Sequence, residues 1–511
     1  MNTAIPSTAN NRETGLCLFI KKFKTAGQHY IYDVHSNEII KVSPVVWDII
    51  DHFDKPVNSI AAKLKEKHSK EDILEAHKAV KNSILFKSPG NLFPAIWTNK
   101  DNEAEIKYLF AHSGINQLIL DLTNRCNMRC KYCAYSGKFS FERTHRNKNM
   151  SRECAVKAVD YFIEHSSKKE QAAVTFYGGE SLLEFDLFKY IVEYVKSYPR
   201  DFIFSLTTNG TLLDEEVSRF LIDNDVSIDI SLDGPKSIHD KNRVMRSGSG
   251  SFDSIIENLK LIKKLDRDYF YSKITYRPVL TPPYDAEAIT NYFYNSEFFM
   301  PIKNPIQINP VSTYGSSYIA EADKPAAKQQ YKKNHRKLFA NYKKAITAGK
   351  YDELRIEKTW FRDMIELIHF REKTPLRERH AAIGQCTPGL KRLFVNPDGK
   401  YYMCERVGEH FCIGDNDNGL NFKKISGFFK QWVEFFKECS HCWALRLCKK
   451  CFYEVQQDGK LNTERKESLC RSTLERLEVF MTEYCEILEE NPDAFTDFKP
   501  EDFLPTFGGA S

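Results

Sequence analysis

The feature that most constrains the fold is a regular alternation of strand-like and helix-like segments that begins near residue 115. Short runs rich in β-branched and aromatic residues are followed by longer segments with apolar residues at three- and four-residue spacing. This alternation predicts a parallel sheet covered by helices, either barrel-like or doubly wound. The strand-like runs are INQLILDLT, QAAVTFYGGE, DFIFSLTTNG, VSIDISLDG, SKITYRPVL and PIQINPVS, and the helical segments include RECAVKAVDYFIEHS and SFDSIIENLKLIKKL.

Three cysteines follow the first of these strands, in the stretch LDLTNRCNMRCKYCAYSG. Cys126, Cys130 and Cys133 lie on the loop after the strand, where parallel α/β folds collect their ligands. A structural zinc site would need a fourth ligand to close its tetrahedron, and buried thiols that only pack are the other simple interpretation. A cubane iron–sulfur cluster also takes thiolate ligands. If only three irons of such a cluster are held by cysteine, the fourth is open to a small chelating ligand.

The spacing Cys-x3-Cys-x2-Cys, with Tyr132 before the last cysteine, resembles the signature of the radical S-adenosylmethionine (radical SAM) enzymes. In that family the open iron binds the amino and carboxylate groups of S-adenosylmethionine. One electron then cleaves the sulfonium and yields a 5′-deoxyadenosyl radical that abstracts a hydrogen from the substrate. The resemblance therefore implies a [4Fe–4S] cluster at Cys126, Cys130 and Cys133, with S-adenosylmethionine as cosubstrate.

Motifs at the ends of the following strands extend this resemblance. Glycines let a backbone approach a ligand closely, and in the family the motif matched here by FYGGE contacts the amino group of the cosubstrate. The family usually has proline next, whereas this chain has Ser181, a departure that bears on the turn. In similar enzymes a serine and an arginine hold the carboxylate and ribose region, a task that suits the fixed fork of donors of arginine. The resemblance thus assigns cofactor binding to Gly178, Gly179, Glu180, Asn209, Ser231, Asp233 and Arg243.

A second group of cysteines lies between residues 386 and 470, around VNPDGKYYMCER and CSHCWALRLCKKC. This region resembles the SPASM extension of peptide- and protein-modifying radical SAM enzymes, which carries up to two auxiliary [4Fe–4S] clusters. The family usually has three residues between the third and fourth cysteines of the run, whereas this chain has two. By position, the resemblance assigns an outer cluster to Cys439, Cys442, Cys448 and Cys470, and an inner cluster to Cys386, Cys404 and Cys451.

The fourth ligand of the inner cluster is left open by the sequence. Some relatives have another cysteine about six residues before the first, but this chain has none between residues 154 and 386. One interpretation is an open iron, which relatives have been proposed to use for a substrate thiolate; the others are ligation by His380 or by Cys412. A zinc ribbon or knuckle is the alternative for the whole region. The isolated Cys17, Cys154 and Cys485 are expected to be packing thiols.

The pattern of residues 16–90 predicts a separate small module of three short strands followed by three helices. Ser43 is the expected N-cap of the first helix, with Pro44 at its first position. The pattern resembles the winged-helix recognition domain fused to many peptide maturases. In that family an extended leader peptide adds a strand to the third strand and packs on the third helix. The corresponding surfaces here are residues 37–43 and about 70–84. A nucleic-acid-binding winged helix is the alternative, but the third helix mixes charges and has no basic stripe.

Charge and composition narrow the remaining choices. The 511 residues carry 74 basic and 69 acidic side chains, so the net charge of +5 gives no argument for a strongly anionic partner such as duplex nucleic acid. The N-terminus lacks the pattern of a secretory signal, and no apolar run is long enough to span a membrane. We therefore expect a cytoplasmic protein, in which 14 cysteines call for metal chemistry more than for disulfides. The basic run KKNHRKLFANYKK is interpreted as a solvated helix face.

Together these observations predict an α/β chain with a partial (β/α)6 TIM-like barrel, an N-terminal winged-helix domain and a C-terminal cysteine-rich SPASM extension. The expected domains are a leader-recognition domain at residues 1–100, a radical SAM barrel at 110–320, a helical bridge at 321–380, the SPASM domain at 381–485 and a tail at 486–511. A helix from about 472 to 490 is expected near the end.

The resemblance implies a radical SAM maturase of a ribosomally synthesised peptide, with an electron donor such as flavodoxin or ferredoxin. Thioether cross-linking is the leading product class and carbon–carbon cross-linking the next. The alternatives are an anaerobic sulfatase-maturing enzyme that makes formylglycine, a tRNA-modifying radical enzyme and a zinc-bearing peptide-binding scaffold. Nothing in the sequence singles out a general base.

Overall fold

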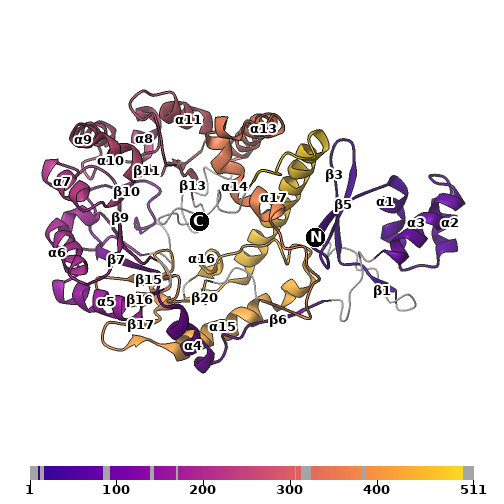
Figure 1. The fold of residues 1–511 in the computed structure, drawn as a ribbon, viewed down its shortest axis with the longest axis horizontal. Coiled ribbons are helices and arrows are strands. Elements are labelled where there is room, and N and C mark those ends of the chain that lie inside the picture. Colours follow the sequence, from indigo (N-terminus) through magenta and orange to yellow (C-terminus); the bar gives the residue numbers. More distant parts are fainter. Residues whose placement is uncertain are drawn as a thin grey trace.

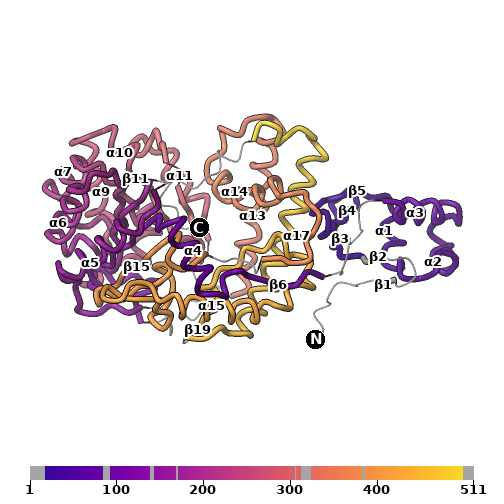
Figure 2. The backbone as a smooth tube through the Cα atoms, turned by 60° about the horizontal axis from the view of Figure 1, so that its bottom comes forward, coloured from indigo at the N-terminus to yellow at the C-terminus, as the bar shows by residue number. Residues whose placement is uncertain are grey.

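The computed structural model shows an elongated molecule with a small lobe at one end (Figures 1 and 2). It describes residues 10–11, 16–83, 93–137, 143–168, 171–282, 284–304, 306–311, 324–381, 386–457 and 459–498. The predicted boundary KSPGNLFP falls largely on residues 84–92, outside the described residues.

The N-terminal lobe is an antiparallel three-stranded sheet followed by three short helices, as predicted. Ser43 caps the first helix by accepting a hydrogen bond from the Val46 N–H, and Pro44 occupies the first helical position. Strand β5 is one edge of this sheet, since among the described residues it pairs with β4 alone. The elements are β3 (Ile20–Lys24), β4 (His29–Asp33), β5 (Glu38–Val42), α1 (Pro44–Ile49), α2 (Val57–Leu64) and α3 (Lys70–Asn82), preceded by the short pair β1 (Asn10–Asn11) and β2 (Leu16–Cys17).

The centre of the molecule is a nine-stranded sheet of order β11-β10-β9-β8-β7-β15-β16-β17-β18. The strands from β11 to β15 are parallel, so the carboxyl ends of β7 to β11 meet along one edge. In Figure 1 these strands curve through the large lobe with the helices outside. The five strands of the predicted barrel are β7 (Gln117–Thr123), β8 (Ala173–Gly178), β9 (Ile203–Thr208), β10 (Ser227–Ile230) and β11 (Ile274–Tyr276).

Alternate residues of these strands face the helices and form the main core. Leu118, Leu120 and Leu122 of β7 are fully buried in it. The opposite face is more polar, as shown by the hydrogen bond from Gln117 Nε2 to Thr175 Oγ1 at 2.6 Å. The connecting helices are α5 (Arg152–His165), α6 (Phe185–Lys196), α7 (Glu215–Asp223), α8 (Lys236–Asn242), α9 (Phe252–Leu265), α10 (Arg267–Lys273) and α11 (Ala286–Tyr294).

The predicted sixth strand lies beside β11 but is regular only in part: the Gln307 N–H donates to Tyr276 O of β11 at 3.1 Å, and the Val311 N–H donates to Leu280 O at 2.9 Å. PIQINPVS contributes only β13 (Asn309–Pro310), which pairs with β12 (Val279–Leu280) in a separate two-stranded sheet. Two prolines in this run remove backbone donors that a central strand needs.

The other side of β7 is instead occupied by the C-terminal region. Strand β15 (Arg392–Val395) pairs in parallel with β7, and β16 (Lys400–Tyr402), β17 (Gly414–Asp415) and β18 (Gly419–Leu420) extend the sheet as antiparallel strands. The cysteine-rich region therefore shares one sheet with the strand that precedes Cys126.

Helices of the second half bridge the large lobe to the N-terminal lobe. The predicted helix at about 472–490 begins earlier, because Asn462 caps it by accepting from the Arg465 N–H, so the helix includes Cys470. The remaining elements are β6 (Ala95–Trp97), α4 (Glu103–Ser113), α13 (Pro325–Thr347), α14 (Ile356–His369), β14 (Arg379–Ala381), α15 (Phe422–Phe436), α16 (Phe452–Val455), β19 (Gln456–Gln457), β20 (Lys460–Leu461) and α17 (Thr463–Glu490). Within the described residues, no helix has the length and apolar character needed to cross a membrane.

Candidate active site

The first cysteine loop leaves the carboxyl end of β7 and keeps its three thiols together. The pKa values of Cys126 and Cys133 are raised to about 12, mainly by burial and in smaller part by the neighbouring thiols. A group of thiols that oppose one another's ionisation in this way is suited to a cationic centre that stabilises all of them as thiolates.

Nearby polar groups contact two of the sulfurs, and donors face Cys126. The Met128 N–H donates to Cys126 Sγ at 3.4 Å, and Asn209 Nδ2 lies 3.9 Å from the same sulfur. His145 Nε2 lies 3.7 Å from Cys133 Sγ. Donors around sulfur stabilise thiolate ligands and tune the potential of iron–sulfur clusters, so the loop fits such a cluster.

Gly178 and Gly179 hold the end of β8 against the start of the cysteine loop. Gly178 has φ +130°, and a Cβ at Gly179 would lie 2.1 Å from the backbone oxygen of Arg125. Backbone bonds from Gly179 N to Thr123 O and from Glu180 N to Arg125 O, both 2.8 Å, join the two loops. The glycines therefore position the residues just before Cys126; their predicted contact with the cosubstrate stays a prediction.

Glu180 and Asn209 connect the ends of β8 and β9. The Glu180 side chain is 1% exposed and accepts from Thr208 Oγ1 and from the Asn209 N–H, each at 2.8 Å. The Asn209 side chain in turn donates to Asn127 Oδ1 at 2.9 Å and accepts from the N–H and hydroxyl of Thr211. The predicted site residue Asn209 is thus engaged with the cysteine loop in this structure.

Asp233 and Arg243 form the polar centre at the end of β10. Arg243 Nε donates to Asp233 Oδ1 at 2.9 Å, and the Val279 N–H donates to the same oxygen at 2.9 Å. The Tyr132 hydroxyl donates to the other carboxylate oxygen. Burial raises the pKa of Cys130, whereas the charge of Arg243 lowers it. Predicted residues from three separate segments are therefore brought together beside the cysteine loop, with half-buried Ser231 close by in the chain.

Comparison with known proteins agrees with this arrangement, since the radical SAM superfamily model matches residues 120–291. Residues 120–291 form a radical SAM domain. The chain is 33% identical over 142 residues to the serine-type anaerobic sulfatase-maturating enzyme of Bacteroides thetaiotaomicron, covering 27% of this chain and 34% of that protein. The cysteine-type anaerobic sulfatase-maturating enzyme of Clostridium novyi is 28% identical over 208 residues, covering 38% and 52%. The chain thus spans about a third of the first relative and about half of the second.

Among solved structures, native anSMEcpe with bound AdoMet and Kp18Cys peptide has a similar fold. Its TM-score is 0.55 at 22% identity, with 74% of this chain and 99% of that chain covered. A radical SAM domain implies a [4Fe–4S] cluster and S-adenosylmethionine, and the thiol group at Cys126, Cys130 and Cys133 fits that cluster.

The four cysteines predicted for an outer cluster come together from two elements. Cys439, Cys442 and Cys448 lie in one loop and Cys470 in α17. The pKa of Cys439 is raised to about 12, mainly by burial and in smaller part by the other three thiols. The predicted set is therefore grouped in space.

The three cysteines predicted for an inner cluster form a looser group. The pKa of Cys404 is raised to about 12, mainly by burial and in smaller part by Glu405 and Cys451. The pKa of Cys451 is likewise raised by burial and, in smaller part, by the exposed Cys386. Among the described residues no three His, Cys, Asp or Glu side chains are arranged to hold a single metal ion, so these thiols are grouped without a preformed single-ion site.

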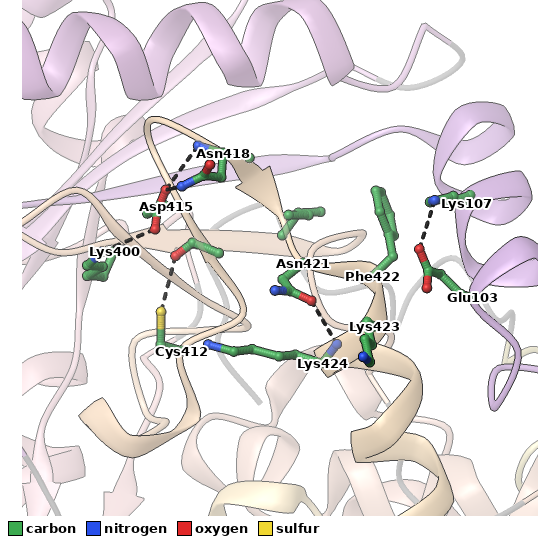
Figure 3. Close-up of a pocket in the computed structure, with 13 residues that line it drawn as sticks. Glu103, Lys107, Lys400, Cys412, Asp415, Asn418, Asn421, Phe422, Lys423 and Lys424 are labelled. Carbon is green, nitrogen blue, oxygen red and sulfur yellow. Dashed lines mark hydrogen bonds and ion pairs between the residues drawn. The ribbon is translucent and has the colours of Figure 1, made fainter.

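The two alternative fourth ligands have other contacts in this structure. His380 Nδ1 lies 2.8 Å from its neighbour's carbonyl, Ala381 O, within β14. Cys412 donates to Gly414 O at 3.1 Å and lines a separate cavity of about 600 Å³ beside Lys400 and Lys424 (Figure 3). These contacts favour neither residue as a ligand. Of the isolated cysteines, Cys154 and Cys485 pack in the interior, whereas the Cys17 side chain is outside the described residues.

His145 and Asn127 were not singled out from the sequence. His145 reaches Cys133 because the chain returns along the end of β7, where the Met150 N–H donates to Leu122 O at 2.8 Å. No spacing pattern signals such a return. Asn127 could have been suspected from its place between two cysteines, but its partner Asn209 is 82 residues away.

Proposed function

We propose that this protein is a radical SAM enzyme that modifies a ribosomally synthesised peptide, with thioether cross-linking as its leading product. The observation that carries the proposal is the grouping of Cys126, Cys130 and Cys133 beside the buried Asp233–Arg243 pair at the carboxyl ends of β7 and β10. When bound, the cluster and S-adenosylmethionine would supply a 5′-deoxyadenosyl radical that takes a hydrogen atom from the peptide.

The chain's own residues would hold these groups in place. Cys126, Cys130 and Cys133 would ligate the cluster, while Arg243, oriented by Asp233, would hold the carboxylate and ribose region of the cosubstrate together with Ser231. Gly178, Gly179 and Glu180 would fix the loop before Cys126. Cofactor placement would thus depend on contacts among strand ends that are far apart in the sequence.

Two auxiliary clusters would be held by the outer and inner cysteine groups described above. With three thiols in the inner group, a cysteine of the peptide would complete the ligation there. Thioether formation would then remove a hydrogen atom from carbon and a proton from that thiol, and the electron released as the C–S bond closes would pass to the auxiliary cluster, leaving the peptide lighter by two hydrogen atoms. An electron donor such as flavodoxin or ferredoxin would supply the reducing electron.

The N-terminal lobe would act as the winged-helix recognition domain for the leader peptide. Strand β5 is an unpaired edge of its sheet among the described residues, and edge strands can be extended by a peptide strand. The leader would lie along β5 and against α3, with the core peptide reaching the large lobe.

Formylglycine formation is the second candidate, because the two relatives above are named anaerobic sulfatase-maturating enzymes. The products differ chemically. A thioether keeps the sulfur and loses the free thiol, whereas formylglycine carries an aldehyde that reacts with hydrazides. Carbon–carbon cross-linking would leave every cysteine thiol free to alkylate.

The first test is iron and sulfide content after anaerobic reconstitution, in the wild type and in a Cys126→Ala, Cys130→Ala, Cys133→Ala variant. We expect about twelve irons falling to about eight, together with loss of deoxyadenosine formation. Cys154→Ala is the matched control, since that thiol contacts Asn416 Nδ2 at 3.2 Å and Pro397 O at 3.9 Å and belongs to none of the cysteine groups. Zinc without iron would refute the proposal. If iron is found, peptides encoded beside the gene are assayed by mass to identify the product class.

A further inference from the structure

The loop that carries three of the outer cysteines is also the surface on which the N-terminal lobe docks. Arg446, between Cys442 and Cys448, donates to the carbonyls of Val34 at 3.4 Å and His35 at 3.2 Å, at the end of β4. The same guanidinium donates to Thr374 O at 2.6 Å. One side chain of the cysteine loop therefore ties two separate backbone segments together.

Aromatic packing on the same loop reinforces this contact. The Trp443 ring meets the Tyr32 ring of β4 edge-on, with centroids 6.3 Å apart, and Lys21 Nζ lies 5.6 Å from the Trp443 centroid. Tyr32 is fully buried, and its hydroxyl donates to Asn37 Oδ1 at 2.6 Å. The contact thus extends to the turn that precedes β5.

The other element with an outer cysteine, α17, holds the opposite side of the lobe. Its Glu489 accepts from Thr25 Oγ1 at 2.7 Å and from the Tyr30 hydroxyl at 2.8 Å. Its Glu478 pairs with Lys21 at 2.7 Å. Figures 1 and 2 both show β3 lying beside α17. Both elements that supply outer thiols therefore contact the N-terminal sheet.

The turn between β4 and β5 is where these contacts converge. Asn37, at φ +60°, donates through Nδ2 to Glu372 O at 2.8 Å and accepts at its carbonyl from Arg371 Nε at 2.7 Å. Arg446 also donates to Glu372 O at 3.1 Å. Arg446 and Asn37 therefore donate to the same carbonyl, Glu372 O, and this shared acceptor links the cysteine loop to the turn that leads into β5.

We propose that Arg446 is a positioning residue that couples assembly of the outer cluster to docking of the N-terminal lobe, and so to the placement of the β5 edge. The inference rests on the proposed outer cluster at Cys439, Cys442, Cys448 and Cys470. Ligation of these thiols fixes the loop between Cys442 and Cys448, which fixes the guanidinium against β4. Because the coupling is reciprocal, docking of the lobe also slows loss of the cluster.

Arginine is suited to this task and lysine is not. Its planar fork can donate to several carbonyls at once, whereas an ammonium on a flexible stem cannot hold both segments in one geometry. Lys449 on the same cysteine run is exposed and makes none of these contacts. It serves as a matched control of the same charge.

The test is hydrogen–deuterium exchange of residues 29–42 in the reconstituted holoenzyme. We expect exchange there to rise about fivefold or more in Arg446→Ala, in Arg446→Lys and, by loss of the outer cluster, in Cys470→Ser, but not in Lys449→Ala. Deoxyadenosine formation without peptide should remain in Arg446→Ala. Unchanged exchange in Arg446→Ala and Cys470→Ser, with wild-type iron content in the former, would overturn the coupling but leave the proposed function intact.

A second variant tests the reciprocal direction and does not alter the cysteine loop. Thr25→Val with Tyr30→Phe removes both hydrogen bonds to Glu489 on the lobe side. We expect its outer cluster to lose iron to a chelator several-fold faster than the wild type does. Release at the wild-type rate would contradict the coupling, and absence of an outer cluster from the wild type itself would instead refute that part of the proposed function.

Discussion

Arg243 and Asp233 form an ion pair at the end of β10, with Nε and Oδ1 2.9 Å apart and side chains only 9% and 1% exposed. The hydroxyl of Tyr132, which lies between Cys130 and Cys133, donates to the same carboxylate. The pair therefore joins the cysteine loop to the segment that follows β10. Each buried charge is stabilised by the other, because burial leaves little water to solvate either one if its partner is removed.

Removing one member of this pair should destabilise the protein strongly. We expect Asp233→Asn to lower the free energy of unfolding by about 3 kcal/mol, since it leaves the Arg243 guanidinium buried without its counter-charge. Urea denaturation of the apoprotein measures this. Asp225→Asn is the control, because its pair with Lys273 at 2.6 Å is largely exposed and should be worth less than about 1 kcal/mol. Equal losses in the two variants would contradict this account.

Gly179→Ala should displace the cysteine loop. The added Cβ would meet the carbonyl of Arg125 at 2.1 Å, a backbone contact that cannot be relieved by a side-chain rotation. We expect reconstituted iron to fall by about four per chain, with the auxiliary clusters retained. Gly427→Ala is the control, because its Cβ would point into open space on α15. Full iron content in Gly179→Ala would show that the close approach is unimportant.

Asp121 should make stability depend on pH. Burial raises the pKa of this carboxyl to about 7, although the Arg143 guanidinium lowers it in part. Between about pH 4 and pH 7 the folded protein keeps a proton that the unfolded chain has lost, so the free energy of unfolding falls as pH rises, by at most about 1.4 kcal/mol per unit. Asp121→Asn should remove this slope in urea titrations at pH 5, 6 and 7. An unaltered slope would assign it to other groups.

The N-terminal lobe should be separable from the large lobe in stability. Ile31 of β4 is fully buried in a small cluster with Leu18, Ile20 and Phe53. We expect Ile31→Ala to cost about 2–5 kcal/mol, seen as a lower melting temperature of the lobe, with the transition of the large lobe unchanged. Leu74→Ala is the control, since Leu74 of α3 is 38% exposed. A single transition of the whole chain that shifts together in Ile31→Ala would contradict this account.

Local signals in the sequence were sufficient for several elements. The alternation of apolar runs predicted β7 to β11, and Ser43 with Pro44 predicted the start of α1. Both depend on neighbouring residues alone. The sixth strand is regular only at β13, because the prolines of PIQINPVS remove backbone donors. The predicted start of α17 was too late, because polar residues before 472 obscured the cap at Asn462.

By itself, the sequence determined the chemistry: the thiol spacing, the order of the strand-end motifs and the two cysteine groups, because these depend on residue type and position along the chain. Only the tertiary structure decided which distant residues meet. Three contacts join distant segments, up to 412 residues apart: β15 pairs with β7, His145 approaches Cys133, and Arg446 donates to the backbone at the end of β4. Such contacts follow from how sheets and helices close upon one another, and a pattern of local periodicities does not contain that information.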